Sequence, residues 1–321
     1  MSEPEPNSGK RPTVSVVAPM FNEADNVGPF VAAVVAALSD VSYEVVLVDD
    51  GSVDETWTRI DDCCGENRCV RGVRLSRNFG HQNALFAGMS MAKGRAVVTM
   101  DGDLQHPPSV IPEMLAAWHD GSSIVYTERR DSADASFFKR LTSRWFYAVF
   151  SWLSGVRLRP GSSDFRLVDE RVLNAMLGMG DRDLFLRGVV SWLGFPSTTI
   201  PFQAARRHAG KTKFGFGRML RFSMDALLGF STLPLRLGVW IGFFTALLAF
   251  AEICYIVVQY LRNLTVPGWA SVMTLMSLLF AVLFVLIGII GAYIARIYEI
   301  LKTRPRFVVA ERSGFASDPE S

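Results

Sequence analysis

Residues 96–105 read AVVTMDGDLQ, and residues 45–52 read VVLVDDGS. Each stretch is a β-branched hydrophobic run that ends in paired carboxylates, as expected where a buried parallel strand delivers its last side chains into a ligand crevice. Asp101 and Asp103 are two residues apart, so in an extended backbone their side chains point the same way and can share one hard cation. Gly102 between them allows the backbone to approach a ligand closely. The two stretches therefore predict a metal-assisted nucleotide site on an open α/β sheet.

Strand and helix patterns alternate along the N-terminal part of the chain. Hydrophobic runs predict strands at residues 14–18, 43–48, 70–75, 96–100 and 124–127. The segments between them predict helices at about 25–38, from about 54, at about 83–92 and near 112–119. This alternation implies right-handed βαβ units and a mostly parallel sheet. No GxGxxG follows the first strand, so we expect a Rossmann-like sheet that binds a mononucleotide rather than NAD.

The composition narrows the class of protein. The 321 residues carry a formal net charge of +2, which argues neither for nor against nucleic acid, and no nucleic-acid partner is expected. A CxxC spacing is absent among the four cysteines, Cys63, Cys64, Cys69 and Cys254. We therefore expect a reducing compartment, with neither a disulfide framework nor a zinc site. Residues 1–12 are polar and proline-rich, which predicts a disordered tail and no secretory signal.

Two apolar stretches near the C-terminus predict membrane spans. Residues 237–260 hold one charge, Glu252, and residues 272–295 hold none. Each stretch exceeds the roughly 20 residues that cross the hydrocarbon of a bilayer. The alternative is a helical hairpin buried in a soluble protein, but two such runs in succession favour the membrane.

Basic residues decide the predicted topology. Seven precede the first span, namely Arg206, Arg207, Lys211, Lys213, Arg218, Arg221 and Arg236. Four follow the second span, and only Arg262 lies between the two. By the positive-inside rule the large domain and both termini face the cytoplasm, in a multi-pass protein of the inner membrane with a short outside loop around 263–269. Anionic membrane lipids are then expected partners of the basic stem.

Two further segments, 136–153 and 216–233, mix basic and aromatic residues. Helices of this kind can lie in a bilayer interface, and packing on the domain core is the alternative. The predicted division of the chain is a disordered tail at 1–12, a catalytic domain at 13–215, a juxtamembrane amphipathic helix at 216–235, a transmembrane hairpin at 236–298 and a cytoplasmic tail at 299–321. The hairpin also offers a surface for homo-oligomers, with no number of subunits fixed.

The motifs are weak one by one, because paired Asp residues often only make turns, but they are specific in combination. They are VSVVAPMFNE at 14–23, VDDGS at 48–52, RNFG at 77–80, DGDLQHPP at 101–108, SDFR at 163–166 and RHAGKTKF at 207–214. In this order they resemble glycosyltransferase family 2, whose nucleotide-sugar-binding fold is called GT-A. Within that family the chain resembles the polyisoprenyl-phosphate glycosyltransferases, which include dolichol-phosphate mannose synthases. The two-helix subgroup that glucosylates bacterial undecaprenyl phosphate is most similar, and the resemblance spans roughly residues 13–310.

The resemblance implies a role for each matched residue of the donor site. The nucleoside pocket would be lined by Pro19, Phe21 and Glu23. Asp50 would contact the base, and Asp101 would face the ribose and sugar of the donor. The metal, Mg²⁺ or Mn²⁺, would be held on the donor diphosphate by Asp103 and Gln105. Oxygen ligands of this type suit either ion, and the metal would neutralise the charge on the departing nucleoside diphosphate.

The resemblance also implies roles on the acceptor side. Asp164 occupies the position of the general base, and the donor and acceptor phosphates would be held by Arg129, Arg207 and Lys213. A phosphate monoester has a second pKa of about 6, so near neutral pH the base has little proton to remove. Asp164 therefore either takes a proton or positions metal or acceptor, and the sequence leaves both roles open.

The expected activity is inverting transfer of a sugar from a nucleotide-diphosphate sugar to polyprenyl phosphate at the cytoplasmic face of the membrane. UDP-glucose is the favoured donor, with GDP-mannose or a modified sugar as alternatives. A processive polysaccharide synthase would carry QxxRW, but Leu141 stands where Gln would precede Arg144 and Trp145. A non-catalytic scaffold for sugar-lipid transport is the remaining alternative, against which the complete motif set speaks.

The remaining expectations concern three histidines and Gly102. His81, His106 and His208 form no shared motif, so they are expected to be polar surface or packing residues. Gly102 stands where the family often has Ala, and His106 where it often has an acidic or amide residue. Neither departure removes a predicted ligand.

Overall fold

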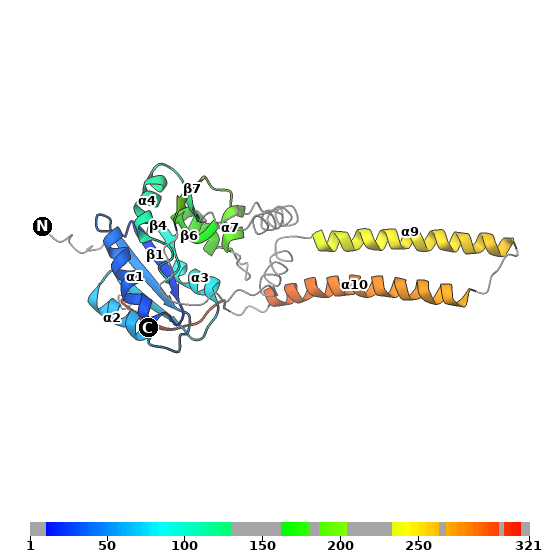
Figure 1. Cartoon of the computed structure of the whole chain (residues 1–321), viewed down its shortest axis with the longest axis horizontal. Coiled ribbons are helices and arrows are strands. Elements are labelled where there is room, and N and C mark those ends of the chain that lie inside the picture. The colour runs from blue at the N-terminus through cyan, green and yellow to red at the C-terminus, as the bar shows by residue number, and fades with distance from the viewer. Residues whose placement is uncertain are drawn as a thin grey trace. The chain divides into compact units, whose positions relative to one another are not determined.

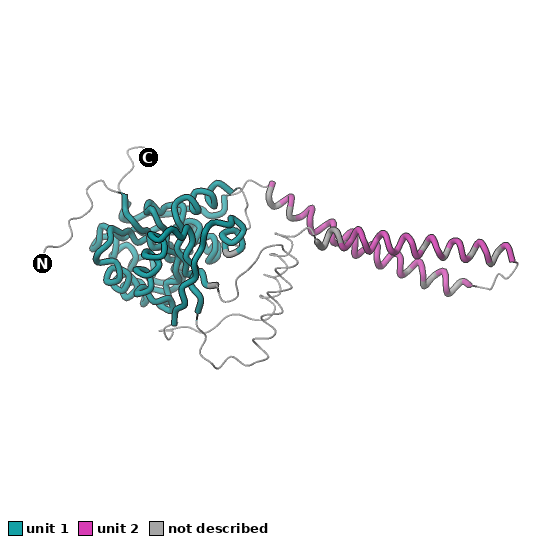
Figure 2. The backbone as a smooth tube through the Cα atoms, turned by 90° about the horizontal axis from the view of Figure 1, so that it is seen from above, with its two compact units in different colours: residues 1–151, 156–213, 304–321 teal, residues 152–155, 214–303 magenta. Residues whose placement is uncertain are grey.

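The computed structural model describes residues 11–129, 162–179, 186–203, 233–262, 268–301 and 305–315. The chain divides into two compact units, one of residues 1–151, 156–213 and 304–321, and one of residues 152–155 and 214–303 (Figure 2). Most of the two predicted amphipathic segments, together with Arg207, His208 and Lys213, lies outside the described residues.

The first unit is built on a sheet with strand order β7-β5-β6-β4-β1-β2-β3-β8 (Figure 1). Its elements run β1 (Val14–Met20), α1 (Ala24–Ala37), β2 (Tyr43–Asp49), α2 (Thr56–Glu66), β3 (Val70–Leu75), α3 (His81–Met91), β4 (Ala96–Thr99), η1 (Pro108–Val110), α4 (Ile111–His119), β5 (Ile124–Arg129), β6 (Ser162–Asp169), α6 (Glu170–Leu177), α7 (Leu186–Trp192), β7 (Ser197–Phe202) and β8 (Val309–Ser313). The second unit contains α9 (Leu233–Leu261) and α10 (Trp269–Leu301). The strands and helices predicted up to residue 127 are confirmed, with ends that differ by a few residues.

The predicted mostly parallel sheet is also confirmed. β1 pairs in parallel with β2 and β4, β2 with β3, and β5 with β7, whereas β6 is antiparallel to β4 and β5. Every residue of β1 is buried because helices cover both faces of the sheet. On one face, Val16 packs in the same core cluster as Phe30 of α1. On the other face, Gly88 brings α3 so close that a Cβ there would lie 2.8 Å from Val48.

The strand order reverses between β1 and β4, which places the ligand crevice at the carboxyl ends of these two strands. The Val17 carbonyl accepts a hydrogen bond from the Met100 amide at 3.1 Å, and the Met20 carbonyl accepts one from the Asp50 amide at 2.9 Å. Pro19 is two residues beyond Val17, so its backbone nitrogen also faces the side of β4. At this point β4 has already ended. A proline therefore removes no ladder bond there, although β1 is a central strand.

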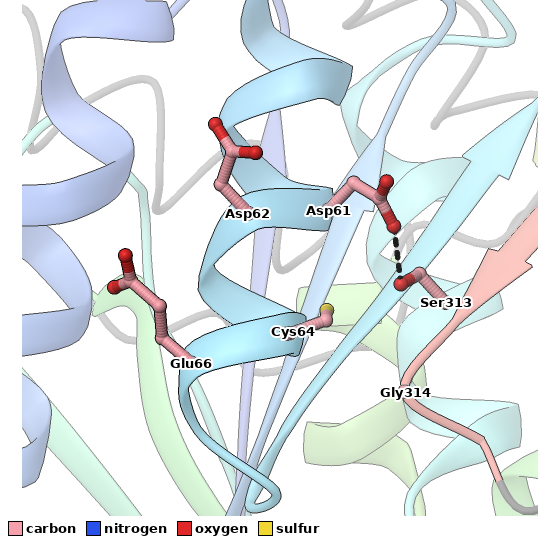
Figure 3. Close-up of a pocket in the computed structure, with 7 residues that line it drawn as sticks. Asp61, Asp62, Cys64, Glu66, Ser313 and Gly314 are labelled. Atoms are coloured by element: carbon pink, nitrogen blue, oxygen red, sulfur yellow. Dashed lines mark hydrogen bonds between the residues drawn. The ribbon is translucent and has the colours of Figure 1, made fainter.

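The sequence analysis predicted none of the strands β6, β7 and β8, and β8 completes the sheet. β8 pairs antiparallel with β3 as the edge strand, and Arg74 of β3 forms an ion pair with Glu311 at 2.7 Å. Ser313 donates a hydrogen bond to Asp61 of α2 at 2.6 Å, beside a hollow that Cys64, Glu66 and neighbouring residues line (Figure 3). Burial raises the pKa of the Cys64 thiol to about 11, so this cysteine is a packed, unreactive side chain. The hollow lies where β3 begins, at the end of the sheet opposite to the crevice.

The second unit is a hairpin in which α9 and α10 lie side by side (Figures 1 and 2). Leu237–Tyr255 and Leu278–Ala295 are long and apolar enough to cross a membrane. Only 6% of the first stretch and none of the second is buried, so within the described residues they are not the core of a soluble unit. Gly238 and Gly242 sit one turn apart against Leu286, where added Cβ atoms would lie 3.3 and 3.6 Å from its methyl groups. Small residues at this spacing allow two helices to approach closely in lipid.

Candidate active site

The DGD loop, residues 101–103, follows directly after β4 at the crevice. The Asp101 side chain is 37% exposed. Asp103 Oδ1 accepts a hydrogen bond from the Gln105 amide at 3.1 Å, and Leu104 between them has a left-handed φ of 60°. The loop is therefore a tight turn, which is compatible with the predicted role of its oxygens as metal ligands.

Gly102 lies against the end of β1. A Cβ at this position would lie 2.6 Å from Met20 Cε and 3.3 Å from the Pro19 carbonyl oxygen. Met20 is 1% exposed, so its side chain cannot move out into solvent without disturbing the core. The absence of a side chain at residue 102 thus sets how closely the DGD loop approaches β1.

Gly102→Ala is expected to lower the free energy of unfolding by about 1–3 kcal/mol, because the extra methyl overpacks this contact. Met20→Ala creates a cavity at the same point, so combining the two substitutions should cost less than the sum of the single ones. Thermal unfolding of the four proteins measures this coupling. Additive changes would show that the two side chains do not compete for one space.

His106 joins the DGD loop to β6. Its Nδ1 accepts a hydrogen bond from the Asp101 amide at 3.0 Å, so in the neutral ring Nε2 carries the proton and donates to Ser163 Oγ at 2.7 Å. The ring is 7% exposed and stacks on Phe165 with centroids 5.2 Å apart. Of the two expectations for His106, a surface residue or a packing residue, the structure supports the second. The buried ring also ties the backbone of Asp101 to the residue before Asp164.

Burial lowers the pKa of His106, and its Nδ1 acceptor role also requires the neutral ring. Below about pH 6.5 the unfolded chain binds a proton that the folded protein does not. The free energy of unfolding therefore decreases as the pH is lowered in this range. The melting temperature should drop between pH 7.5 and pH 5.5, and by less in His106→Asn, which keeps an acceptor near the Asp101 amide. Equal drops in both proteins would show that His106 does not contribute to the pH dependence.

Asp164 and Arg166 form a buried ion pair on β6. The carboxylate Oδ1 lies 2.6 Å from Arg166 Nη2, with side-chain exposures of 6% and 3%. The two residues are i and i+2 on one strand, so they point to the same face. The guanidinium forms a charge-assisted hydrogen bond that holds one oxygen of the carboxylate in place. The geometry thus favours a positioning role over proton removal.

The fold brings Asp101 and Asp164 together at the start of α3. His81 Nε2 lies 3.3 Å from Asp101 Oδ1 and 3.7 Å from Asp164 Oδ2. Gln82 Nε2 donates to the same Asp164 oxygen at 3.3 Å. The sequence analysis missed both contacts because neither residue belongs to a recognised motif; the available signal was their place directly after RNFG.

The VDDGS turn and the RNFG loop are tied together on the other side of the crevice. Asp50 is 3% exposed, and its two carboxylate oxygens accept hydrogen bonds from the amides of Phe79 (2.7 Å) and Gly80 (3.0 Å). Burial raises the pKa of Asp50, and these two bonds oppose that rise. Gly51 has φ of 70°, and a Cβ there would lie 2.7 Å from the Asn78 amide nitrogen. Asp50 therefore anchors the loop, and its contact with a base stays a prediction.

The other predicted donor-site residues line the same edge. Phe21 is 43% exposed beside the crevice, and the Glu23 carboxylate accepts a hydrogen bond from the side chain of Asn26. The Asn22 amide donates to Ser52 Oγ at 2.9 Å, which links this turn to VDDGS. Arg129 ends β5 with an exposed side chain.

The oxygen ligands suit a divalent cation that is shared with substrate. Among the described residues no three His, Cys, Asp or Glu side chains converge on one point. Mg²⁺ is commonly bound through one or two carboxylates together with substrate phosphates, so a site from Asp103 and Gln105 needs no protein cage. The buried Asp101 Oδ1 accepts no hydrogen bond within the described residues, which leaves one more oxygen for a cation or a ligand hydroxyl. The residues present fit the metal.

Sequence comparisons identify the family of the chain. A sequence model of glycosyl transferase family 2 matches residues 15–188. The chain belongs to glycosyltransferase family 2. It is a glycosyltransferase, and its sheet is the predicted GT-A fold. A second model, the GtrB C-terminal hairpin, matches residues 233–297, which include most of α9 and α10.

Relatives match along nearly the whole chain. The uncharacterized glycosyltransferase sll0501 of Synechocystis sp. is 36% identical over 304 residues, covering 94% of this chain and 96% of the relative. The SfII prophage-derived bactoprenol glucosyl transferase of Shigella flexneri is 32% identical over 299 residues, covering 92% and 97%. Glucosyl-3-phosphoglycerate synthase from Mycobacterium tuberculosis, solved with phosphoglyceric acid, aligns with a TM-score of 0.47 and 21% identity over 68% of this chain and 79% of that one.

Proposed function

We propose that this protein transfers glucose from UDP-glucose to a polyprenyl phosphate at the cytoplasmic face of the membrane, with a divalent metal and with inversion at the sugar. The observation that carries the proposal is the meeting of Asp101 and Asp164 beside the DGD loop. In the same chain, two helices of membrane-spanning length follow the catalytic unit. The Shigella flexneri relative, named a bactoprenol glucosyl transferase, supports a lipid phosphate as acceptor and glucose as the sugar.

On the donor side, the loops of the crevice hold the nucleotide. Phe21 offers an exposed aromatic surface, and Asp101 presents a carboxylate oxygen that accepts no hydrogen bond from the described residues. A divalent cation held by Asp103 and Gln105 would supply Lewis-acid stabilisation of the leaving nucleoside diphosphate. The hydrogen bond between His106 and the Asp101 amide keeps the loop at a fixed distance from β6.

On the acceptor side, a phosphate oxygen of the lipid attacks the anomeric carbon, and the bond between this carbon and the nucleoside diphosphate breaks. A phosphate monoester is mostly dianionic at neutral pH, so attack releases no proton that Asp164 must take. The ion pair with Arg166 holds the Asp164 carboxylate in place, which suits the orientation of the reacting groups. Arg129, Arg207 and Lys213 are proposed to bind donor and acceptor phosphates, Arg in a bidentate manner and Lys as a point charge.

The test is transfer of radiolabel to lipid by the full-length protein in detergent. UDP-glucose and GDP-mannose are compared as donors, with polyprenyl phosphate as acceptor and with Mg²⁺, Mn²⁺ or EDTA. We expect label in the lipid phase from UDP-glucose only when metal is present. Transfer from GDP-mannose alone would overturn the donor, and transfer in EDTA would overturn the metal. No lipid label with any donor would overturn the acceptor.

A further inference from the structure

The start of α3 brings two side chains to the carboxylates of the site. His81 Nε2 is within ion-pair distance of both Asp101 Oδ1 (3.3 Å) and Asp164 Oδ2 (3.7 Å). Gln82 Nε2 donates to Asp164 Oδ2 at 3.3 Å. Asp164 Oδ2 therefore has two nitrogens near it, while its other oxygen faces Arg166.

We propose that His81 and Gln82 are positioning residues of the transfer reaction. Two carboxylates that face one crevice repel each other, and a positively polarised ring N–H group between them offsets that repulsion. His81 Nε2 lies between them, within ion-pair distance of both Asp101 and Asp164, and Gln82 donates a hydrogen bond to Asp164. The pair thus sets where the donor-facing carboxylate lies relative to the acceptor-side carboxylate.

The backbone before α3 fixes the positions of His81 and Gln82. The loop at 77–80 is anchored by Asp50, which accepts hydrogen bonds from the Phe79 and Gly80 amides. Gly80 has φ of 92°, a conformation that favours glycine, and it directly precedes His81. The place of His81 is therefore fixed by the buried VDDGS turn rather than by packing of its own ring, which is 43% exposed.

The orientation of Gln82 is determined by its neighbour. Its Nε2 faces the Asp164 carboxylate, because the amide oxygen in that place would oppose another acceptor. Its Oε1 is buried and accepts no hydrogen bond from the described residues. A buried acceptor without a hydrogen bond lowers the stability of the fold. Gln82 carries this cost while it supports Asp164, which is typical of residues that serve the functional site rather than the fold.

The inference rests on the proposed function for its readout, and its test is a steady-state comparison of full-length variants. We expect His81→Ala to lower kcat by about 10–100-fold, the usual effect of losing a group that orients reacting residues. The KM for the donor should change far less, because His81 orients carboxylates and does not provide donor affinity. His81→Gln keeps a polarised N–H group at similar reach and should recover much of kcat. Gln82→Met, which keeps length but loses both polar atoms, should also lower kcat.

Matched controls separate this role from general effects. His119→Gln changes an exposed histidine on α4, and Ser90→Ala changes an exposed residue at the far end of α3. Both should leave kcat unchanged. Because His81 is half exposed, His81→Ala should melt within a few degrees of the unaltered protein, so a loss of kcat is not a loss of fold.

Release of UDP from UDP-glucose without lipid is a second readout, independent of the acceptor. If the unaltered protein releases UDP but labels no lipid, the proposed acceptor fails, and the inference is still judged by the fall in UDP release in His81→Ala. The inference is overturned if His81→Ala keeps kcat within twofold of the unaltered protein. It is also overturned if only the donor KM rises, because His81 would then bind donor without positioning the carboxylates.

Discussion

Asp103→Ala is expected to lower kcat by at least about 1000-fold, because a metal that stabilises the leaving group contributes several kcal/mol and each 1.36 kcal/mol is tenfold in rate. The half-buried Asp103 carboxylate lies in the DGD turn, where its Oδ1 accepts a hydrogen bond from the Gln105 amide. Its loss should leave the sheet intact. Turnover under saturating metal and donor is the measurement.

Asp120→Ala is the matched control for Asp103→Ala, because Asp120 is an exposed carboxylate at the end of α4. It should change neither turnover nor melting temperature. Normal turnover of Asp103→Ala would contradict the metal assignment directly. Recovery of its turnover at high Mn²⁺ would instead support it, since weakened metal binding can be offset by mass action.

Arg166→Leu is expected to have the largest effect on stability. It leaves the Asp164 carboxylate, 6% exposed, without its cation, and breaking a buried ion pair in this way costs about 3–5 kcal/mol. For a domain of this size that corresponds to a fall in melting temperature of roughly 10 °C. Turnover should fall as well, because Asp164 would lose the partner that holds its carboxylate in place. Thermal unfolding of the detergent-solubilised protein and the transfer assay measure the two effects.

Two companion variants make the Arg166 prediction specific. Arg171→Leu breaks the ion pair with Asp169, but the Arg171 side chain is 76% exposed, so the cost should stay below about 1 kcal/mol. Asp164→Leu combined with Arg166→Leu removes both buried charges and should recover most of the stability but none of the turnover. Equal melting temperatures for Arg166→Leu and Arg171→Leu would show that the Asp164 pair is not buried in solution.

The sequence predicted those parts of the fold that depend on local patterns. The buried strands β1, β2 and β4, of which only Tyr43 is partly exposed, contain long hydrophobic runs, and the carboxylates that follow β2 and β4 marked the crevice. The sequence did not predict β8, because five residues with three charged or polar side chains carry no strand signal on their own. Its partner β3 lies far away in the chain, as the contact between Arg74 and Glu311, 237 residues apart, shows.

The functional site also has parts that the sequence predicted and parts that only the tertiary structure showed. The sequence by itself determined which chemical groups are present: the carboxylates of the DGD loop, Asp164, the hydrophobic spans and the family to which these motifs point. Only the tertiary structure decided that His81 lies between Asp101 and Asp164, that His106 ties the DGD loop to β6, and that Asp50 is occupied by loop amides. The physical reason is that a motif records residue types at short spacing, whereas these contacts join residues brought together by strand order and loop geometry.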